Sequence, residues 1–144
     1  MVTDNRPGFH LAIPVDDLDR ARAFYGGVLQ LPEGRCASTW VDWNFYGHQL
    51  VTHAVPAGEH GPTAGHNPVD GHDVPVPHFG LLLSIDDFHA LADRLRRAGT
   101  EFVIEPYLRF AGEPGEQWTM FCRDPAGNAL EFKAFRDESQ VFAT

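Results

Sequence analysis

The chain has 144 residues, of which 43% are hydrophobic and 22% are charged, a composition that fits one globular domain and argues against disorder. Eleven basic and twenty acidic residues give a formal net charge of -9. This acidity argues against nucleic acid or an anionic membrane as a partner, because both need a basic surface. The sequence shows neither a signal peptide's apolar core nor an apolar run of the ~20 residues that span a bilayer. We therefore expect a cytoplasmic protein in which Cys36 and Cys122 are free thiols.

The first half of the chain reads as a strand, a helix and further strands. Apolar and polar residues alternate over 9–15, which predicts a strand with one apolar face. Asp16 is placed to cap a helix whose apolar residues recur at helical spacing over 18–29. Residues 40–46 and 49–55 have the composition of strands and are separated by a Gly-His turn.

The second half repeats this order. Asp86 is placed to cap a helix, and Gly99 is placed just past its end. Residues 124–128 predict a turn, because Pro fixes φ while Gly and Asn tolerate a positive φ. The strands predicted for this half are 79–85, 101–104, 117–123 and 129–135.

The two halves also match in their letters, which indicates an internal repeat. The string VDDL at 15–18 matches IDDF at 85–88, and GHQL at 47–50 matches GNAL at 127–130. The sequence therefore predicts one domain made of two similar modules. The first is expected over 8–56 and the second over 77–136, with a linker rich in Gly, Pro and His over 57–76.

Strand parity then selects a set of polar residues. The apolar residues of each strand should face the helices, which leaves His10, His78 and Glu131 on the opposite faces, expected to line a cup, with His53 nearby. Two imidazoles and one carboxylate with open positions form the ligand set of non-haem Fe(II) oxygenases. The alternative is that each histidine is a hydrogen-bonded core residue, although an inward glutamate needs a partner.

Three further residues are candidates for contact with a substrate. Trp40 and Trp118 are candidates for this contact, with a place in the core or in the wall of the cup as the alternative. Arg109 lies beside the Gly-rich segment that ends at 116 and could meet an anionic substrate, or could be an ordinary surface arginine.

Three strings resemble a known superfamily: FHLAIPVDDLDRARAFYGGVL, HFGLLLSIDDFHALADRLRRAG and DPAGNALEFKAF. The chain resembles, over nearly its whole length, the vicinal oxygen chelate superfamily, which groups glyoxalases, bleomycin resistance proteins and extradiol dioxygenases. The resemblance implies an α+β fold in which two βαβββ modules form a cup-shaped mixed sheet with the helices outside.

The resemblance also implies roles for individual residues. His10 matches the family's first-strand ligand, His78 resembles the second histidine of the extradiol dioxygenases, and Glu131 resembles their metal-binding carboxylate. The first-half position that matches Glu131 is Val51, which argues against the four-ligand site of glyoxalase I-like members. Extradiol enzymes also have an acid–base His and a Tyr upstream of the glutamate, and 109–122 contains neither. His53, Tyr107 or a histidine of the linker would have to take that role.

We therefore expect a metal-dependent, extradiol-dioxygenase-like oxidoreductase that binds a small aromatic substrate through its oxygens to Fe(II), with Zn, Ni or Mn as alternative metals. One alternative is a glyoxalase- or epimerase-like lyase or isomerase that uses a non-redox metal. Another is a metal-free, drug-binding resistance protein. The resemblance further implies a homodimer, in some relatives one that exchanges modules.

Overall fold

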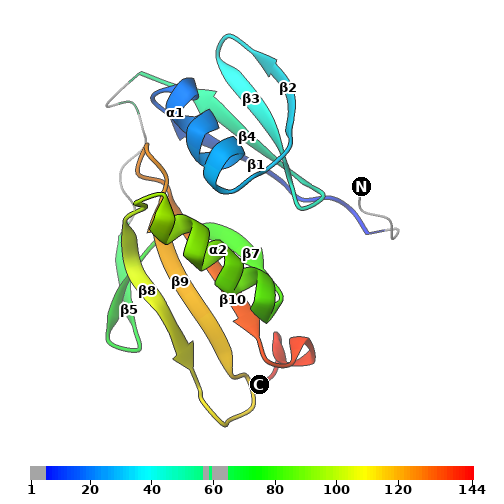
Figure 1. Cartoon of the computed structure of the whole chain (residues 1–144), viewed down its shortest axis with the longest axis vertical. Coiled ribbons are helices and arrows are strands. Elements are labelled where there is room, and N and C mark those ends of the chain that lie inside the picture. Colours follow the sequence, from blue (N-terminus) through cyan, green and yellow to red (C-terminus); the bar gives the residue numbers. More distant parts are fainter. Residues whose placement is uncertain (1–5, 57–58, 60–64) are drawn as a thin grey trace. The chain divides into compact units, whose positions relative to one another are not determined.

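The computed structural model describes residues 6–56, 59 and 65–144. The chain forms two compact units (Figure 1). The first comprises residues 1–63 and 125–128, and the second comprises 64–124 and 129–144. The turn predicted at 124–128 thus belongs largely to the first unit, where the Asn128 side-chain amide donates to the carbonyl of Pro14 at 2.8 Å.

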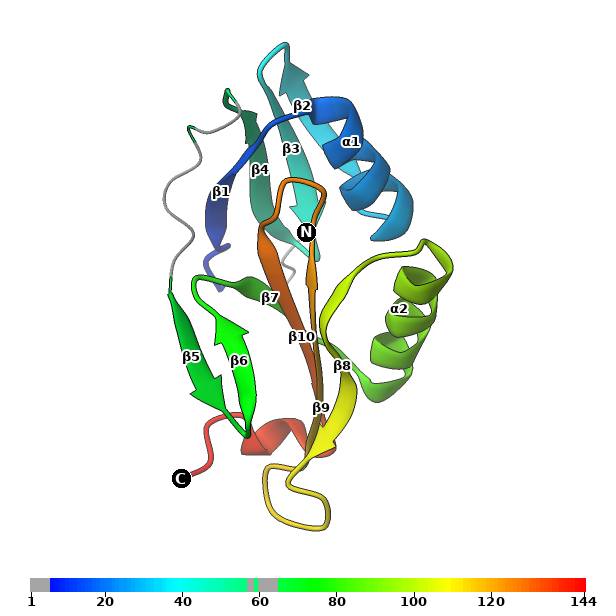
Figure 2. The ribbon, with the colours of Figure 1, turned by 90° about the vertical axis from the view of Figure 1, so that its left-hand side faces the viewer.

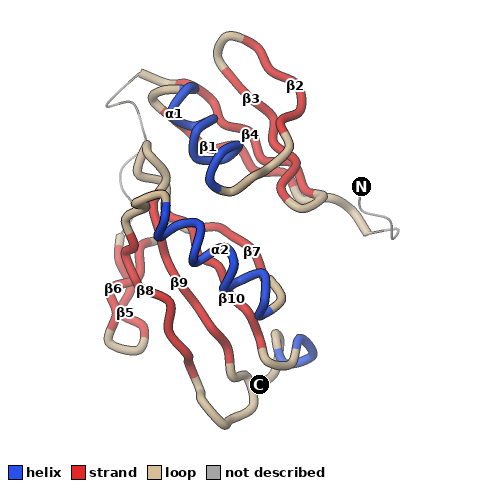
Figure 3. The backbone as a smooth tube through the Cα atoms, viewed as in Figure 1, coloured by secondary structure: helices blue, strands red, loops and turns tan. Residues whose placement is uncertain are grey.

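The first unit is a four-stranded sheet with a helical segment on one face (Figures 1 and 3). Its strands are β1 (His10–Val15), β2 (Glu33–Ala37), β3 (Trp40–Phe45) and β4 (His48–Ala54), in the order β1-β4-β3-β2. β1 runs parallel to β4, and the other pairs are antiparallel. The helix predicted over 18–29 is a short α1 (Leu18–Arg22) that continues as a π-helical segment, Ala23–Val28.

The core of this unit lies between the sheet and its helical segment. Tyr25 and Trp43 are buried with their ring centroids 6.0 Å apart, and the Trp43 indole N–H donates to Thr52 Oγ1 at 3.1 Å. Gly26 lets the tryptophan approach closely, since a Cβ there would lie 3.2 Å from the ring. Because residues of a strand alternate between faces, every second residue of β4 faces the helical segment and this core.

The second unit repeats the arrangement. Its strands are β7 (Phe79–Leu82), β8 (Phe102–Arg109), β9 (Gln117–Arg123) and β10 (Ala129–Phe135), in the order β7-β10-β9-β8, with α2 (Ile85–Arg97) on one face. β7 runs parallel to β10. A short 3-10 turn, Glu138–Gln140, follows the last strand. The α+β fold of two βαβββ modules is therefore confirmed.

Three local predictions need correction. Asp17 rather than Asp16 caps α1, accepting from the Arg20 N–H at 3.0 Å. Ser84 rather than Asp86 caps α2, because its hydroxyl accepts the Asp87 N–H at 3.1 Å. β8 continues well past the predicted 101–104, because an edge strand with register shifts can accommodate a proline. By contrast, Gly99 takes the expected positive φ after α2.

The predicted linker, 57–76, contains a hairpin. β5 (His66–Val69) pairs with β6 (His72–Pro75) through a tight turn in which Asp70 and Gly71 both have positive φ. Val74 of the hairpin packs against Ile104 and Phe121, on the sheet face opposite α2 (Figure 2). Residues 57–58 and 60–64 of the linker lie outside the described part of the chain.

In the part of the chain that the structure describes, no helix is long and apolar enough to cross a membrane.

The two cysteines differ in burial, which predicts different reactivity. Cys36 is exposed, whereas burial raises the pKa of Cys122 to about 12. At about pH 8 only one Cys122 thiol in roughly ten thousand would be ionised. We expect a thiol-specific chromogenic disulfide reagent to label one cysteine rapidly in the native protein and both in denaturant. Cys36→Ser should leave no fast-reacting thiol, and rapid labelling of that variant would contradict the assignment.

Gly80 allows β7 to approach β10 closely. A Cβ at Gly80 would lie 1.5 Å from the carbonyl oxygen of Glu131, so a side chain requires a backbone shift. We expect Gly80→Ala to lower the free energy of unfolding by about 1–3 kcal/mol, measured by urea denaturation. Gly65→Ala is the matched control, because a Cβ there meets no atom within 4 Å. If the two variants have equal free energies of unfolding, the backbones of β7 and β10 can shift apart at no cost, which contradicts this prediction.

Candidate functional site

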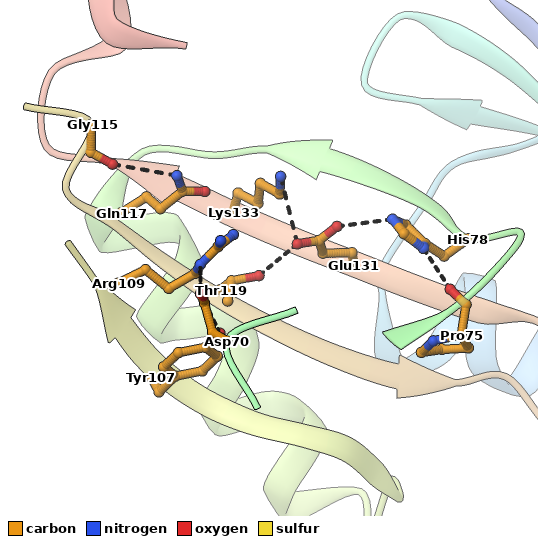
Figure 4. Close-up of polar contacts among 10 residues, drawn as sticks. All are labelled: Asp70, Pro75, His78, Tyr107, Arg109, Gly115, Gln117, Thr119, Glu131 and Lys133. Carbon is orange, nitrogen blue, oxygen red and sulfur yellow. Dashed lines mark hydrogen bonds and ion pairs between the residues drawn. The ribbon is translucent and has the colours of Figure 1, made fainter. Parts of the chain in front are cut away.

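A polar face covers the side of the second unit's sheet opposite α2 (Figure 4). It consists of Gly80, Tyr107, Arg109, Gln117, Thr119, Glu131 and Lys133. Strand register brings these residues together: Glu131 pairs with Gly80 of β7, and Thr119 lies between Lys133 and Tyr107 of its two neighbouring strands. Because alternate residues of a strand share a face, four strands contribute to one surface.

The structure brings together His78 and Glu131, two of the three predicted metal ligands. The His78 Nε2 lies 3.0 Å from the Glu131 Oε2. The His78 Nδ1 lies 2.7 Å from the Pro75 carbonyl, which can only accept, so Nδ1 carries a proton (Figure 4). In the neutral ring Nε2 then holds the lone pair and faces the carboxylate. A backbone carbonyl that fixes the tautomer in this way is typical of metal-binding histidines.

The carboxylate of Glu131 has polar neighbours on both oxygens. Its side chain is 10% exposed, and the Thr119 hydroxyl donates to Oε1 at 2.8 Å. The Lys133 ammonium lies 3.6 Å from the same oxygen, beyond hydrogen-bonding distance. The His78 ring also meets Phe121 edge to face, with centroids 4.9 Å apart. Glu131 and His78 are therefore held from several sides, as a ligand pair requires.

The hairpin supplies a second ion pair at the edge of this face. Asp70, in the hairpin turn, forms a short ion pair with the Arg109 guanidinium and accepts a hydrogen bond from the Tyr107 hydroxyl at 3.4 Å. Burial raises the pKa of Tyr107 above its usual value; Asp70 and Glu131 raise it further, and Arg109 opposes the shift. Tyr107 is therefore protonated at neutral pH and can donate a hydrogen bond or a proton.

Gln117 leaves one acceptor open on the polar face. The residue is 7% exposed, and its side-chain N–H donates to the Gly115 carbonyl at 3.3 Å. Within the described residues, its Oε1 is buried without a hydrogen-bond partner. A buried amide oxygen in this state is costly and calls for a donor from water or a ligand.

The third predicted ligand, His10, lies on β1 in the first unit. Its Nδ1 is 2.8 Å from the Gln49 Oε1, and the Gln49 amide N–H donates to Asp42 at 3.3 Å. Because Asp42 fixes the amide orientation, the Gln49 oxygen must accept from Nδ1, which leaves Nε2 with the lone pair. His10 therefore has the same tautomer as His78, enforced by a side chain rather than by the backbone.

The remaining candidates fall on different surfaces. His53 is exposed on β4, opposite the half-buried Trp40 on β3, and both lie on the face of the first unit's sheet that carries His10. Trp118 lies on the other face of the second sheet, where its ring meets Phe88 and His89 of α2. Since β9 alternates, a residue adjacent to Thr119 must point away from Glu131. Trp118 is half-buried against α2 and is not part of the polar face, which corrects its prediction as a substrate contact.

Sequence reasoning missed Thr119, Lys133 and Asp70. Strand parity could have found the first two, because each lies an even number of residues from a residue on the polar face. The signal for Asp70 is the Asp-Gly pair at 70–71, which favours a tight hairpin turn.

Among the described residues, no group of three or more His, Cys, Asp or Glu side chains is arranged to hold a metal ion. The donor chemistry of His78 and Glu131 nevertheless fits two ligands of such an ion, since one imidazole lone pair and one carboxylate face each other.

Comparison with solved structures shows similar folds. A glyoxalase/bleomycin resistance protein/dioxygenase from Alicyclobacillus acidocaldarius is 30% identical, with a TM-score of 0.77, covering 98% of this chain and 100% of that one. The fosfomycin resistance protein FosX from Listeria monocytogenes is 14% identical, with a TM-score of 0.69 and coverage of 94% and 97%. A lactoylglutathione lyase from Agrobacterium tumefaciens is 18% identical, with a TM-score of 0.65 and coverage of 99% of both chains.

A search of curated proteins finds no match. A family model does match, over residues 9–132, and it describes the glyoxalase/bleomycin resistance protein/dioxygenase superfamily. With the two βαβββ modules and the match over most of the chain, the protein belongs to the glyoxalase/bleomycin resistance protein/dioxygenase superfamily.

Proposed function

We propose that the protein is a metal-dependent enzyme that binds a small substrate through two neighbouring oxygens, and that its reaction is an extradiol-type oxidation with O2. One observation carries the proposal: His78, with its tautomer fixed by Pro75, presents Nε2 to Glu131 at 3.0 Å. The pairing of an imidazole lone pair with a carboxylate supports a divalent cation between them.

His10 is proposed as the third ligand, on the basis of its tautomer and of the family resemblance. Two histidines and one carboxylate favour Fe(II), with Zn, Ni or Mn as alternatives. When bound, such a metal supplies Lewis-acid charge to the substrate oxygens and, as iron, redox chemistry with O2. A homodimer remains a prediction.

The chain's own residues support the chemistry around the metal. The Thr119 hydroxyl orients the Glu131 carboxylate by donating to one of its oxygens. The neutral Tyr107 hydroxyl can donate to a substrate oxygen or to a leaving group. Phe121 packs against the edge of the His78 ring and limits its rotation. A lyase or isomerase with a non-redox metal would use the same residues, so the metal and the consumption of O2 distinguish the two reactions.

Metal binding is the first test of this proposal. We expect untagged protein, reconstituted anaerobically with Fe(II), to bind about one metal ion per chain by elemental analysis. His78→Ala and Glu131→Gln should each weaken metal binding at least about tenfold, because each removes a ligand. His66→Ala is the matched control, since that histidine is exposed and pairs with Asp73 in the hairpin.

Metal binding by His78→Ala, Glu131→Gln and His10→Ala separates the parts of the proposal. Wild-type affinity in His78→Ala and Glu131→Gln would overturn the His78–Glu131 site, because the metal would then bind elsewhere. A wild type that takes up no metal would leave a metal-free binding protein as the function. If His10→Ala alone keeps the metal, the His78–Glu131 pair stays in the site and the third ligand must be sought elsewhere.

The reaction is tested by oxygen uptake. With Fe(II) bound, we expect catechol-type substrates to consume one O2 each and to yield a ring-opened product heavier by the mass of O2. Tyr107→Phe should lower kcat by a factor of about 100 or more if the hydroxyl moves a proton. Tyr46→Phe, on the exposed turn after β3, should leave the rate unchanged. Turnover without O2 would instead identify a lyase or isomerase.

A further inference from the structure

One basic residue of this chain differs from all the others. Of the eleven basic residues ten are arginines, and Lys133 is the single lysine. It lies on β10, two residues after Glu131, and therefore on the same face of the sheet (Figure 4). A lysine ammonium is a compact point charge on a flexible stem, whereas arginine is a planar fork. Lys133 therefore offers a compact, mobile positive charge where the chain's other basic side chains offer planar guanidinium groups.

The Lys133 ammonium is close to a carboxylate but only loosely held. Its Nζ lies 3.6 Å from the Glu131 Oε1, which already accepts a shorter hydrogen bond from Thr119. The other carboxylate oxygen faces His78. Lys133 is 30% exposed along its side chain, so the charge is partly withdrawn from water without a hydrogen bond to Glu131. Such a cation is well placed to bind a second anion.

The other cation of the polar face is already paired. Arg109 is 15% exposed and is held by Asp70 of the hairpin, which lies outside the ligand set. Lys133 differs, because the carboxylate nearest to it is the proposed metal ligand itself. A metal ion would engage the charge of Glu131 and leave the ammonium beside a second positive centre.

The charges on this face then indicate what a substrate must supply. Arg109 and Lys133 balance Asp70 and Glu131, so the four groups sum to zero. A divalent ion adds two positive charges next to Lys133. The charge on the two oxygens bound to the metal would be directed to the metal itself, whereas a separate anionic group on the same ligand would pair with the ammonium.

We propose that Lys133 binds an anionic group of the substrate, of the carboxylate class, that lies beside the two oxygens bound to the metal. This inference rests on the proposed function, because it assumes a metal ion at Glu131. It adds a substrate class, namely small organic anions rather than neutral diols.

The test compares two ligands of similar size on zinc-loaded protein, where no oxidation occurs. Calorimetry measures the affinities of 3,4-dihydroxybenzoate and of 4-methylcatechol, which lacks the carboxylate, under anaerobic conditions. We expect the carboxylated ligand to bind at least about tenfold more tightly, the effect of one charge-assisted hydrogen bond. Lys133→Met should reduce this preference to about twofold or less, and Lys133→Arg should preserve most of it.

Arg136→Met is the matched control, because it removes one positive charge just after β10, from an arginine paired with Glu116. It should retain the full preference. A second readout uses the uniqueness of the lysine: protein labelled with 13C at lysine Cε gives one lysine signal from this chain. That signal should shift with 3,4-dihydroxybenzoate and stay in place with 4-methylcatechol.

The outcomes distinguish this inference from the proposed function on which it rests. If the protein takes up zinc but binds the two ligands with equal affinity, the inference about Lys133 is overturned and the proposed function is not. The same holds if the lysine signal does not shift with 3,4-dihydroxybenzoate. A preference that survives in Lys133→Met also overturns it and assigns the anion to another group. Failure of the protein to take up zinc overturns both, and elemental analysis before the titration identifies that case.

Discussion

The hydrogen bond between His78 and the Pro75 carbonyl determines the chemistry of the polar face. An imidazole can present either nitrogen, and only the one without a proton can bind a metal. Pro75 ends β6, so the hairpin selects the nitrogen that faces Glu131. The hairpin itself is anchored by packing of Val74 and by the ion pair of Asp70. A segment between the two modules thereby fixes the tautomer of a proposed metal ligand in the second module.

Glu131 shows how a carboxylate can be kept largely out of water. Desolvation of an isolated carboxylate costs several kcal/mol, so each oxygen needs a partner. Thr119 supplies a hydrogen bond to one oxygen from the neighbouring strand, and the other oxygen lies 3.0 Å from the His78 Nε2, where the proposed cation would bind. Gly80 is part of the same arrangement, because its missing side chain lets the backbone of β7 lie against that of β10. Packing and electrostatics therefore act together on this one side chain.

Strand alternation made much of this protein predictable from its sequence. Apart from β2, which is not predicted, the order of elements in the two modules and the shared face of Glu131 with its strand neighbours follow from period-two patterns in the strands. The hairpin was missed because Pro68 and Pro75 within it are typical of loops, and they outweighed the Asp-Gly turn. Aromatic character alone does not indicate which face of a strand Trp118 occupies, whereas its position one residue from Thr119 predicts the face toward α2. The helix caps differ because several Ser and Asp residues compete for one position, and only backbone geometry selects among them.

The ion pair between Asp70 and Arg109 has a consequence for how this architecture can vary. Asp70 lies at the tip of the connecting segment, and Arg109 lies at the end of β8. Loops between modules ordinarily tolerate insertions and deletions. Here a change of even two residues between Gly65 and Pro77 would move the tip away from its arginine and the Pro75 carbonyl away from His78. The site therefore constrains the length of this linker. A chimera that exchanges the second module must include the hairpin.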